Sequence, residues 1–145
     1  MSSTKKVIRR VRPVLLSEMD FEIRECSIPD IGLGLFAKRL VRPGDTIGAY
    51  TGIIIDDAQS EEEPYVSSRY LVWVCKDCWI VGDSDEGNYT RFINHSKRPN
   101  AELVTSTRWK SARIKAIRLI RPGGEVFFDY GDEYWEALES EVKPL

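Results

Sequence analysis

Hydrophobic residues along this chain are grouped in short runs that turn residues separate, and long stretches with a helical period are rare. Residues 21–25 (Phe-Glu-Ile-Arg-Glu) alternate apolar and charged side chains, which is typical of a half-buried strand. Two Arg-Pro-Gly turns, at residues 42–44 and 121–123, each precede an apolar segment. We therefore expect strands at residues 46–50 and 125–130.

The rest of the chain repeats this pattern. Residues 32–37 predict a glycine-broken turn that leads into a strand, and residues 56–64 predict a polar loop or short helix. Only residues 133–141 have a helical pattern longer than one turn. Further strands are expected at residues 67–74, 78–81, 101–104 and 112–116. Many short strands with frequent turns predict a mainly β, compact fold rather than a doubly wound nucleotide-binding fold.

Composition indicates one soluble globular domain, with 145 residues, 42% hydrophobic residues and 30% charged residues. Residues 1–12 carry five basic groups and no acid, which leaves 16 basic against 23 acidic groups in the remainder. An acidic body of this kind suits a cationic partner and disfavours direct nucleic-acid binding. The acidic stretches 56–57 and 61–63 are either an attractive surface for a basic tail or a solubilising loop. No apolar run has the ~20 residues of a membrane span, so no membrane association is expected.

The three cysteines are Cys26, Cys75 and Cys78. An odd number of cysteines without a signal peptide favours a reducing, intracellular compartment. Cys75-x-x-Cys78 has the spacing of half a zinc site, but Cys26 and His95 are the only other Cys or His residues that could complete four ligands. The pair also continues a strand-like run, whereas redox pairs usually open a helix. We expect packing thiols and assign no metal site.

Candidate chemistry lies in residues 91–100, which hold the only histidine, and in residues 125–131, which end in a Tyr-Gly corner. The Asn94 carboxamide can hold an amino-acid-like group. His95 is a candidate base, ligand or structural residue. Tyr130 stays neutral at physiological pH, because the ordinary pKa of tyrosine is ~10, so it serves as a hydrogen-bond donor. Taken singly, these residues and the flat rings of Trp73, Tyr134 and Trp135 are more typical of a core.

Their order along the chain is more informative than any one of them. It runs through Gly-x-Gly at 32–34, Tyr-x-Gly at 50–52, Gly-Asn-x-x-Arg-Phe-Ile-Asn-His-Ser-x-x-Pro-Asn at 87–100 and Gly-Glu-x-x-x-Asp-Tyr-Gly at 124–131. This order resembles the SET-domain protein lysine methyltransferases over about residues 20 to 138. The resemblance implies the SET-domain β-clip fold, with short strands in small sheets, a pseudoknot and a short C-terminal helix. It also implies a basic N-terminal arm and entry segment at 1–19, a catalytic domain at 20–138 and a tail at 139–145.

The resemblance further implies a binding site for S-adenosylmethionine and a narrow channel for lysine. Tyr130 matches the catalytic tyrosine of the family. The implied cofactor-binding residues are Ile31, Gly32, Leu33, Asn94, His95, Tyr130, Tyr134 and Trp135. The implied channel residues are Tyr50, Leu103 and Phe128. Phe at the position of Phe128 is associated in the family with the addition of more than one methyl group.

The function implied is an S-adenosylmethionine-dependent protein-lysine N-methyltransferase that acts on a histone or another basic protein tail. Because no cysteine cluster flanks the domain, the chain resembles a minimal SET protein of bacterial or viral type. Closure of the site then falls to residues 134–138, to the substrate or to a partner subunit, which makes a homodimer an open expectation. The expected location is the cytoplasm or, for a histone modifier, the chromatin or nucleus, including that of a host cell.

Two alternative functions of other classes stay open. The first is an inactive SET-like module that binds a protein or the cofactor without turnover, for which Leu103 or a missing cover over the site would be the cause. The second is a nucleic-acid binder that uses the basic arm at residues 5–12.

Overall fold

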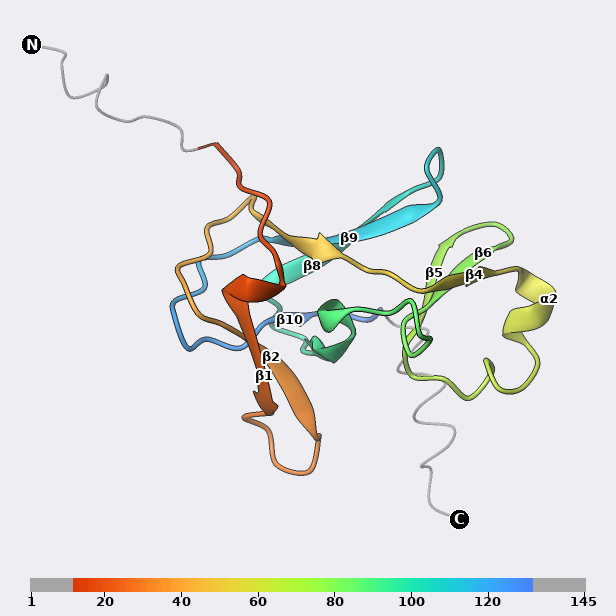
Figure 1. The fold of residues 1–145 in the computed structure, drawn as a ribbon, viewed down its shortest axis with the longest axis horizontal. Helices are drawn as coiled ribbons and strands as arrows, with labels where there is room; N and C mark the ends of the chain where they lie inside the picture. Colours follow the sequence, from red (N-terminus) through yellow and green to blue (C-terminus); the bar gives the residue numbers. More distant parts are fainter. Residues whose placement is uncertain (1–11, 132–145) are drawn as a thin grey trace, which may run out of the picture.

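The computed structural model describes residues 12–131 of the chain (Figure 1). Within this range, ten strands form four small sheets, and helical segments are short. The prediction of a mainly β fold of short strands in small sheets is confirmed. The short C-terminal helix expected at residues 133–141 lies outside the described residues.

The first sheet pairs β1 (Phe21–Glu25) with β2 (Leu33–Ala37) in antiparallel register, after the short 3-10 helix η1 (Glu18–Asp20). The expected alternation of burial in β1 is wrong, because Phe21 alone is buried and Ile23 is 41% exposed. β1 is an edge strand of this two-stranded sheet, and its last four residues are exposed. In β2, by contrast, the last four residues are buried.

A three-stranded sheet with the order β3-β9-β8 forms the middle of the molecule. Its members are β3 (Thr46–Ala49), β8 (Ala101–Ser106) and β9 (Ser111–Ala116). The strands predicted at 46–50, 101–104 and 112–116 are therefore confirmed within two residues at each end. Residues of β9 alternate between exposed and buried, as the period of a strand with one face on the core requires.

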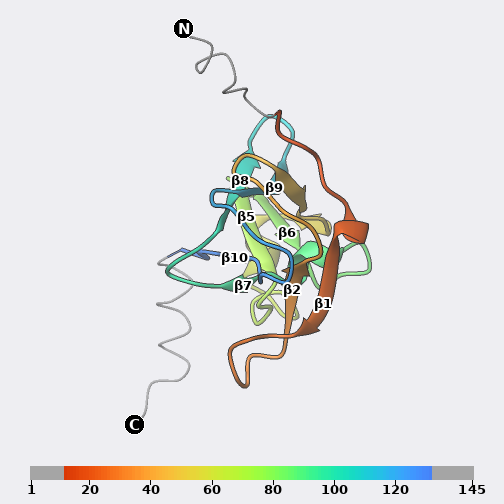
Figure 2. The same ribbon diagram turned by 90° about the vertical axis from the view of Figure 1, so that its left-hand side faces the viewer.

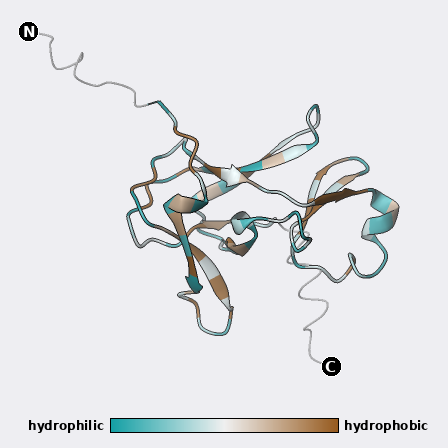
Figure 3. Cartoon of the chain, viewed as in Figure 1, coloured by the Kyte–Doolittle hydropathy of each residue, from teal (hydrophilic) through white to brown (hydrophobic). Residues whose placement is uncertain are grey.

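A second three-stranded sheet with the order β4-β6-β5 stands beside it. It contains β4 (Ile53–Ile55), β5 (Leu71–Cys75) and β6 (Cys78–Val81). The strand expected at 67–74 begins only at Leu71. Figure 3 shows polar residues of α2 (Asp57–Ser60) next to the hydrophobic β4. The α2 segment begins with a capping box, in which the Asp56 carboxylate accepts from Gln59 N at 2.8 Å and Gln59 Oε1 accepts from Asp56 N at 2.9 Å.

Two segments that are far apart in the sequence lie side by side (Figure 2). The 3-10 helix η2 (Tyr89–Phe92) leads into β7 (Asn94–His95), which pairs in parallel with β10 (Phe127–Phe128). The predicted strand at 125–130 is only two residues long, because Val126 N first donates to Leu35 O at 2.8 Å and the segment then leaves β2 for β7. We call this β7–β10 pairing the knot, because it joins the two segments for which the resemblance implies a pseudoknot.

The Asn100 side chain holds the knot together. Its Nδ2 donates to Glu125 O at 2.8 Å, and its Oδ1 accepts from Phe127 N at 2.8 Å. An amide side chain thus supplies the two hydrogen bonds that a neighbouring strand would supply at this point. The Pro-Asn turn of the long motif therefore has a structural purpose in binding the final tyrosine segment.

The core lies between the sheets and contains Leu35, Val41, Ile47, Ile93, Ile114 and Val126, each less than 2% exposed. Cys75 and Cys78 belong to this core as free thiols, in agreement with their interpretation as packing residues. Trp73 does not, because it lies on the edge strand β5 and is 55% exposed. None of the helices in the described part of the chain is long and apolar enough to cross a membrane.

Candidate functional site

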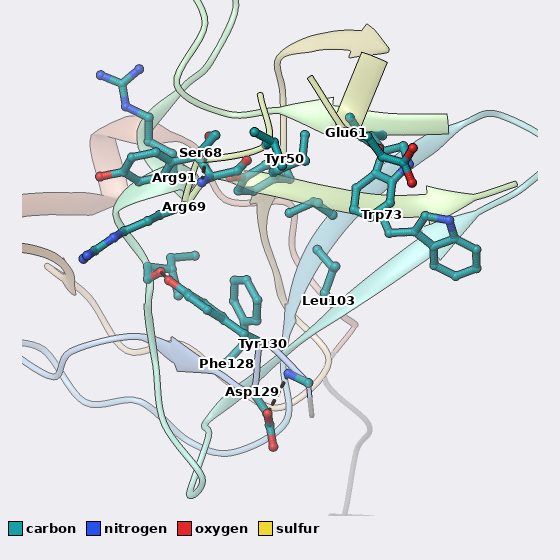
Figure 4. A pocket seen from close by; sticks show the side chains of 18 residues that line it. Tyr50, Glu61, Ser68, Arg69, Trp73, Arg91, Leu103, Phe128, Asp129 and Tyr130 are labelled. Atoms are coloured by element: carbon teal, nitrogen blue, oxygen red, sulfur yellow. Dashed lines mark hydrogen bonds between the residues drawn. The ribbon is translucent and has the colours of Figure 1, made fainter. Parts of the chain in front are cut away.

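A cavity of about 770 Å³ lies between the β4-β6-β5 sheet and the knot (Figure 4). Four of the residues named from the sequence line it together: Tyr50 at the end of β3, Leu103 of β8, and Phe128 and Tyr130 of the final segment. Figure 4 places Tyr50 across the cavity from Phe128 and Tyr130. The structure therefore brings residues from three separate parts of the sequence to one site.

The two phenols of the cavity are fixed by the backbone. The Tyr50 hydroxyl donates to Tyr70 O at 2.7 Å, and the Tyr130 hydroxyl donates to Ile93 O at 2.6 Å. Burial, with a smaller effect from Tyr130, raises the pKa of Tyr50 far above its ordinary value, so this phenol stays protonated. Because each hydroxyl hydrogen is directed to a carbonyl, the phenol oxygens retain lone pairs that can accept a hydrogen bond.

Apolar side chains form the part of the wall beside Tyr130. The ring centroids of Phe128 and Tyr130 lie 4.9 Å apart, and Ile93 and Leu103 complete this part of the cavity wall. The Asp129 carboxylate, although adjacent in sequence, turns away and accepts from Gly131 N at 2.8 Å (Figure 4). Within residues 12–131, this part of the site combines aromatic faces with the two phenol oxygens, and the neighbouring Asp129 carboxylate points away from them.

His95 contacts Tyr130, the candidate catalytic residue, through a hydrogen bond and a ring contact. Its Nδ1 accepts from Tyr130 N at 2.8 Å, and the two rings meet edge to face with centroids 5.2 Å apart. Burial lowers the pKa of His95 below the ordinary 6.5; Asp129, 3.7 Å away, acts in the opposite direction, and Lys97 adds to the lowering. The imidazole is therefore neutral at pH 7, which the acceptor role of Nδ1 requires.

This geometry makes folding sensitive to acid. The unfolded chain takes up a proton on His95 near pH 6.5, whereas the folded chain does so only at lower pH. The free energy of unfolding should therefore be highest above pH 6.5 and should fall as the pH drops through that value. Since His95 is the only histidine, His95→Gln should flatten the profile between pH 7 and 5.5 in thermal unfolding measurements. An unchanged slope in the variant would contradict this role.

The loop between β1 and β2 lies next to the knot. Asn94 Nδ2 donates to Leu33 O at 2.9 Å, which joins the loop to β7. Gly32 has φ +101°, with no atom within 4 Å of the place where a Cβ would be, so backbone is open there. The flanking Ile31 and Leu33 are about half exposed, at 52% and 50%.

The predicted site residues thus fall into two connected groups. Tyr50, Leu103, Phe128 and Tyr130 line the cavity, whereas Ile31, Gly32, Leu33, Asn94 and His95 lie on the β1–β2 loop, the start of β2 and β7. Tyr130 connects the groups through its hydrogen bonds to Ile93 and His95. Tyr134 and Trp135 lie outside the described residues.

Two arginines of the cavity wall are absent from the candidates named in the sequence, whereas Trp73 and the acidic stretch 61–63 are among them. Arg69 and Arg91 lie at one end, and Glu61 and Trp73 at the other (Figure 4). Arg91 belongs to the long motif and was available as a candidate. Arg69 carried no such signal, because residues 67–70 were expected to be strand and instead form turns. Among residues 12–131, no group of three or more His, Cys, Asp or Glu side chains is placed to hold a metal ion.

The SET-domain family profile matches residues 32–131 of this chain. The histone-lysine N-methyltransferase Set2 of Drosophila melanogaster is 33% identical over 106 residues, which cover 68% of this chain and 5% of that protein. The mouse histone-lysine N-methyltransferase NSD3 is 34% identical over 107 residues, covering 68% of this chain and 7% of NSD3. The chain therefore spans a small part of the length of these curated relatives.

Solved structures agree with the fold. A chain of the Chaetomium thermophilum polycomb repressive complex 2 matches with a TM-score of 0.68 at 24% identity, over 77% of this chain and 15% of that chain. A structure of the same complex in an autoinhibited conformation, bound to S-adenosylmethionine, matches with a TM-score of 0.67 at 25% identity, over 86% of this chain and 17% of that chain.

Proposed function

Because this chain belongs to the SET-domain family, we propose that it is a protein-lysine N-methyltransferase that uses S-adenosylmethionine. One observation supports the proposal most strongly: the knot brings Tyr130 into hydrogen-bond contact with Ile93 and His95 at the wall of a cavity. Relatives named as histone-lysine N-methyltransferases support the same activity.

The residues of the β1–β2 loop and of β7 fit S-adenosylmethionine, the cofactor of SET methyltransferases. The open backbone at Gly32 and the half-exposed Ile31 and Leu33 offer peptide groups and apolar contact surface. We assign Ile31, Gly32, Leu33, Asn94, His95 and Tyr130 to cofactor binding. When bound, the cofactor supplies a methyl group on a positively charged sulfur.

The cavity residues suit the transfer of that methyl group to an amine. Lysine must lose its proton first, since its ordinary pKa is ~10.4, and an apolar wall such as Phe128 favours the neutral amine by desolvation. The Tyr50 and Tyr130 oxygens can then orient the amine, and alignment of reactants is a large source of acceleration. Positive charge persists throughout, so aromatic faces and oxygen dipoles stabilise it better than a fixed cation.

The proposed substrate is a histone or another basic protein tail. Glu61 lies in the cavity wall next to the exposed Trp73, and Glu62 and Glu63 follow it in sequence. A carboxylate and an indole face suit a cationic side chain that flanks the target lysine. A histone substrate would place the protein on chromatin.

We propose the same division of the chain as the sequence implies. Residues 1–19 form the N-terminal arm and entry segment, residues 20–138 the catalytic domain and residues 139–145 the tail.

Phe128 should set how many methyl groups are added. It is buried in the cavity, and it supplies no hydroxyl to restrain a partly methylated amine. We expect the natural protein to add two or more methyl groups and Phe128→Tyr to stop mainly after one, as measured by mass spectrometry of a peptide product. Phe127→Tyr is the matched control, because successive side chains of a strand point to opposite faces. An equal change in both variants would contradict this role.

Two measurements separate the enzyme from an inactive binding module. Calorimetry should detect S-adenosylmethionine binding, and a cofactor with a labelled methyl group should then label lysine-containing proteins or peptides. Absence of cofactor binding would contradict the proposed function. Binding without transfer to any member of a broad peptide array would favour the inactive module.

A further inference from the structure

Glu125 is a buried carboxylate to which the proposed methyl transfer gives no role. It is 8% exposed, and within residues 12–131 it forms no ion pair with Lys, Arg or His. Four hydrogen bonds from neutral groups compensate its burial instead. A buried carboxylate is costly to retain, so its environment indicates a specific purpose.

The two oxygens of Glu125 serve different parts of the site. Oε1 accepts from the Ser27 backbone N–H at 3.0 Å and from the Ser27 hydroxyl at 2.7 Å. Oε2 accepts from the Cys26 thiol at 3.0 Å and from Asn94 Nδ2 at 3.4 Å. Burial acts to raise the pKa of Glu125, but these hydrogen bonds outweigh it and leave the pKa below its ordinary value. The group is therefore an anion that links the base of the β1–β2 loop to the knot.

The surroundings hold this carboxylate in one place. The Glu125 carbonyl accepts from Asn100 Nδ2, and Val126 N donates to Leu35 O, so the backbone is fixed on both sides. A Cβ on Gly34 would collide with the carboxylate and crowd Asn94 Nδ2. The second glycine of the Gly-x-Gly pair thus makes room for Glu125, whereas the first leaves open backbone.

The contacts with Leu33 and Glu125 together determine which way the Asn94 carboxamide faces. Its amide nitrogen has two acceptors, Leu33 O at 2.9 Å and Glu125 Oε2 at 3.4 Å, and two acceptors on one side identify that side as the NH2 group. Asn94 Oδ1 then points the other way, and none of the residues 12–131 donates to it. The β7 side of the site therefore presents an oxygen acceptor.

We propose that Glu125 is a positioning residue that orients Asn94 so that its oxygen accepts a hydrogen bond from the ammonium group of the cofactor. The inference rests on the proposed function, because it presumes a ligand with an amino-acid end. Replacing Glu125 by glutamine puts an NH2 group or a weaker acceptor against Asn94. The carboxamide then loses the restraint that separates its donor side from its acceptor side.

A ligand pair tests this role without turnover. Calorimetry would compare S-adenosylhomocysteine with an analogue whose α-amino group is replaced by hydrogen, on the full chain. Glu125→Gln should weaken the binding of S-adenosylhomocysteine about tenfold or more, as expected for the loss of a charge-assisted hydrogen bond. It should weaken the binding of the analogue less than about threefold. Glu102→Gln, the same change at an exposed position of β8, should affect neither ligand.

The outcomes separate a positioning role from a structural one. Equal weakening of both ligands by Glu125→Gln would overturn the positioning role while leaving the proposed function intact. Failure of the unaltered protein to bind either ligand would overturn both. Should Glu125→Gln not fold, Gly34→Ala tests the same contact, because it displaces the carboxylate without removing its charge. Gly34→Ala should likewise weaken the binding of S-adenosylhomocysteine more than the binding of the analogue. Equal weakening of the binding of both ligands would again overturn the inference.

Discussion

Tyr130→Phe should reduce methyl transfer by about 100-fold or more while leaving the fold intact. The change removes the hydroxyl that donates to Ile93 O at 2.6 Å and the oxygen that can orient a lysine amine. The ring should stay in place, because its contacts with Phe128 and His95 do not need the hydroxyl. Initial rates with a lysine peptide, together with thermal unfolding, would measure both parts of the expectation.

Tyr89→Phe is the matched control for this change. The Tyr89 hydroxyl also donates to a backbone carbonyl, Ile47 O at 2.7 Å, but Tyr89 lies outside the cavity wall. We expect its loss to cost some stability and little activity. Full activity in Tyr130→Phe, or an equal loss in both variants, would refute the role of Tyr130 at the reacting amine.

Asn100→Ala should lower the free energy of unfolding by about 2–4 kcal/mol and should reduce activity more than unfolding explains. Two backbone groups of the final segment, Glu125 O and Phe127 N, lose their partners when the carboxamide is removed. The knot then no longer holds Tyr130 against His95. Denaturant unfolding gives the stability change, and rates measured well below the unfolding temperature give the effect on the site.

Asn88→Ala tests whether the loss of any bridging asparagine is sufficient to reduce activity. Asn88 Nδ2 donates to Ala49 O at 2.9 Å, and its Oδ1 caps η2 through Thr90 N, but neither group belongs to the knot. We expect a cost of about 1 kcal/mol, as for other helix caps, with activity retained in the folded fraction. Equal activity losses in the two variants would argue that the knot has no special place in the site.

The sequence was sufficient to predict most strands and part of the cavity wall. Turn residues and alternation located β3, β6, β8 and β9, because both signals are local. The order of motifs named Tyr50, Leu103, Phe128 and Tyr130 together, and the structure brings these four to one cavity.

Features that depend on distant neighbours were not predictable in the same way. Ile23 and Trp73 have the pattern of buried residues, but each lies on a strand with only one neighbour and stays exposed. The shortness of β10 depends on pairing with β2 and β7, which are far away in sequence. The purpose of Gly34 became clear only from the position of the Glu125 carboxylate.

Mass spectrometry of histones incubated with this protein and S-adenosylmethionine is the decisive test of whether it transfers methyl groups to lysine. We expect lysine side chains to gain methyl groups with the natural protein and almost none to do so with Tyr130→Phe. Cofactor that binds while no lysine gains a methyl group, in purified histones or in a cell extract, would contradict this expectation.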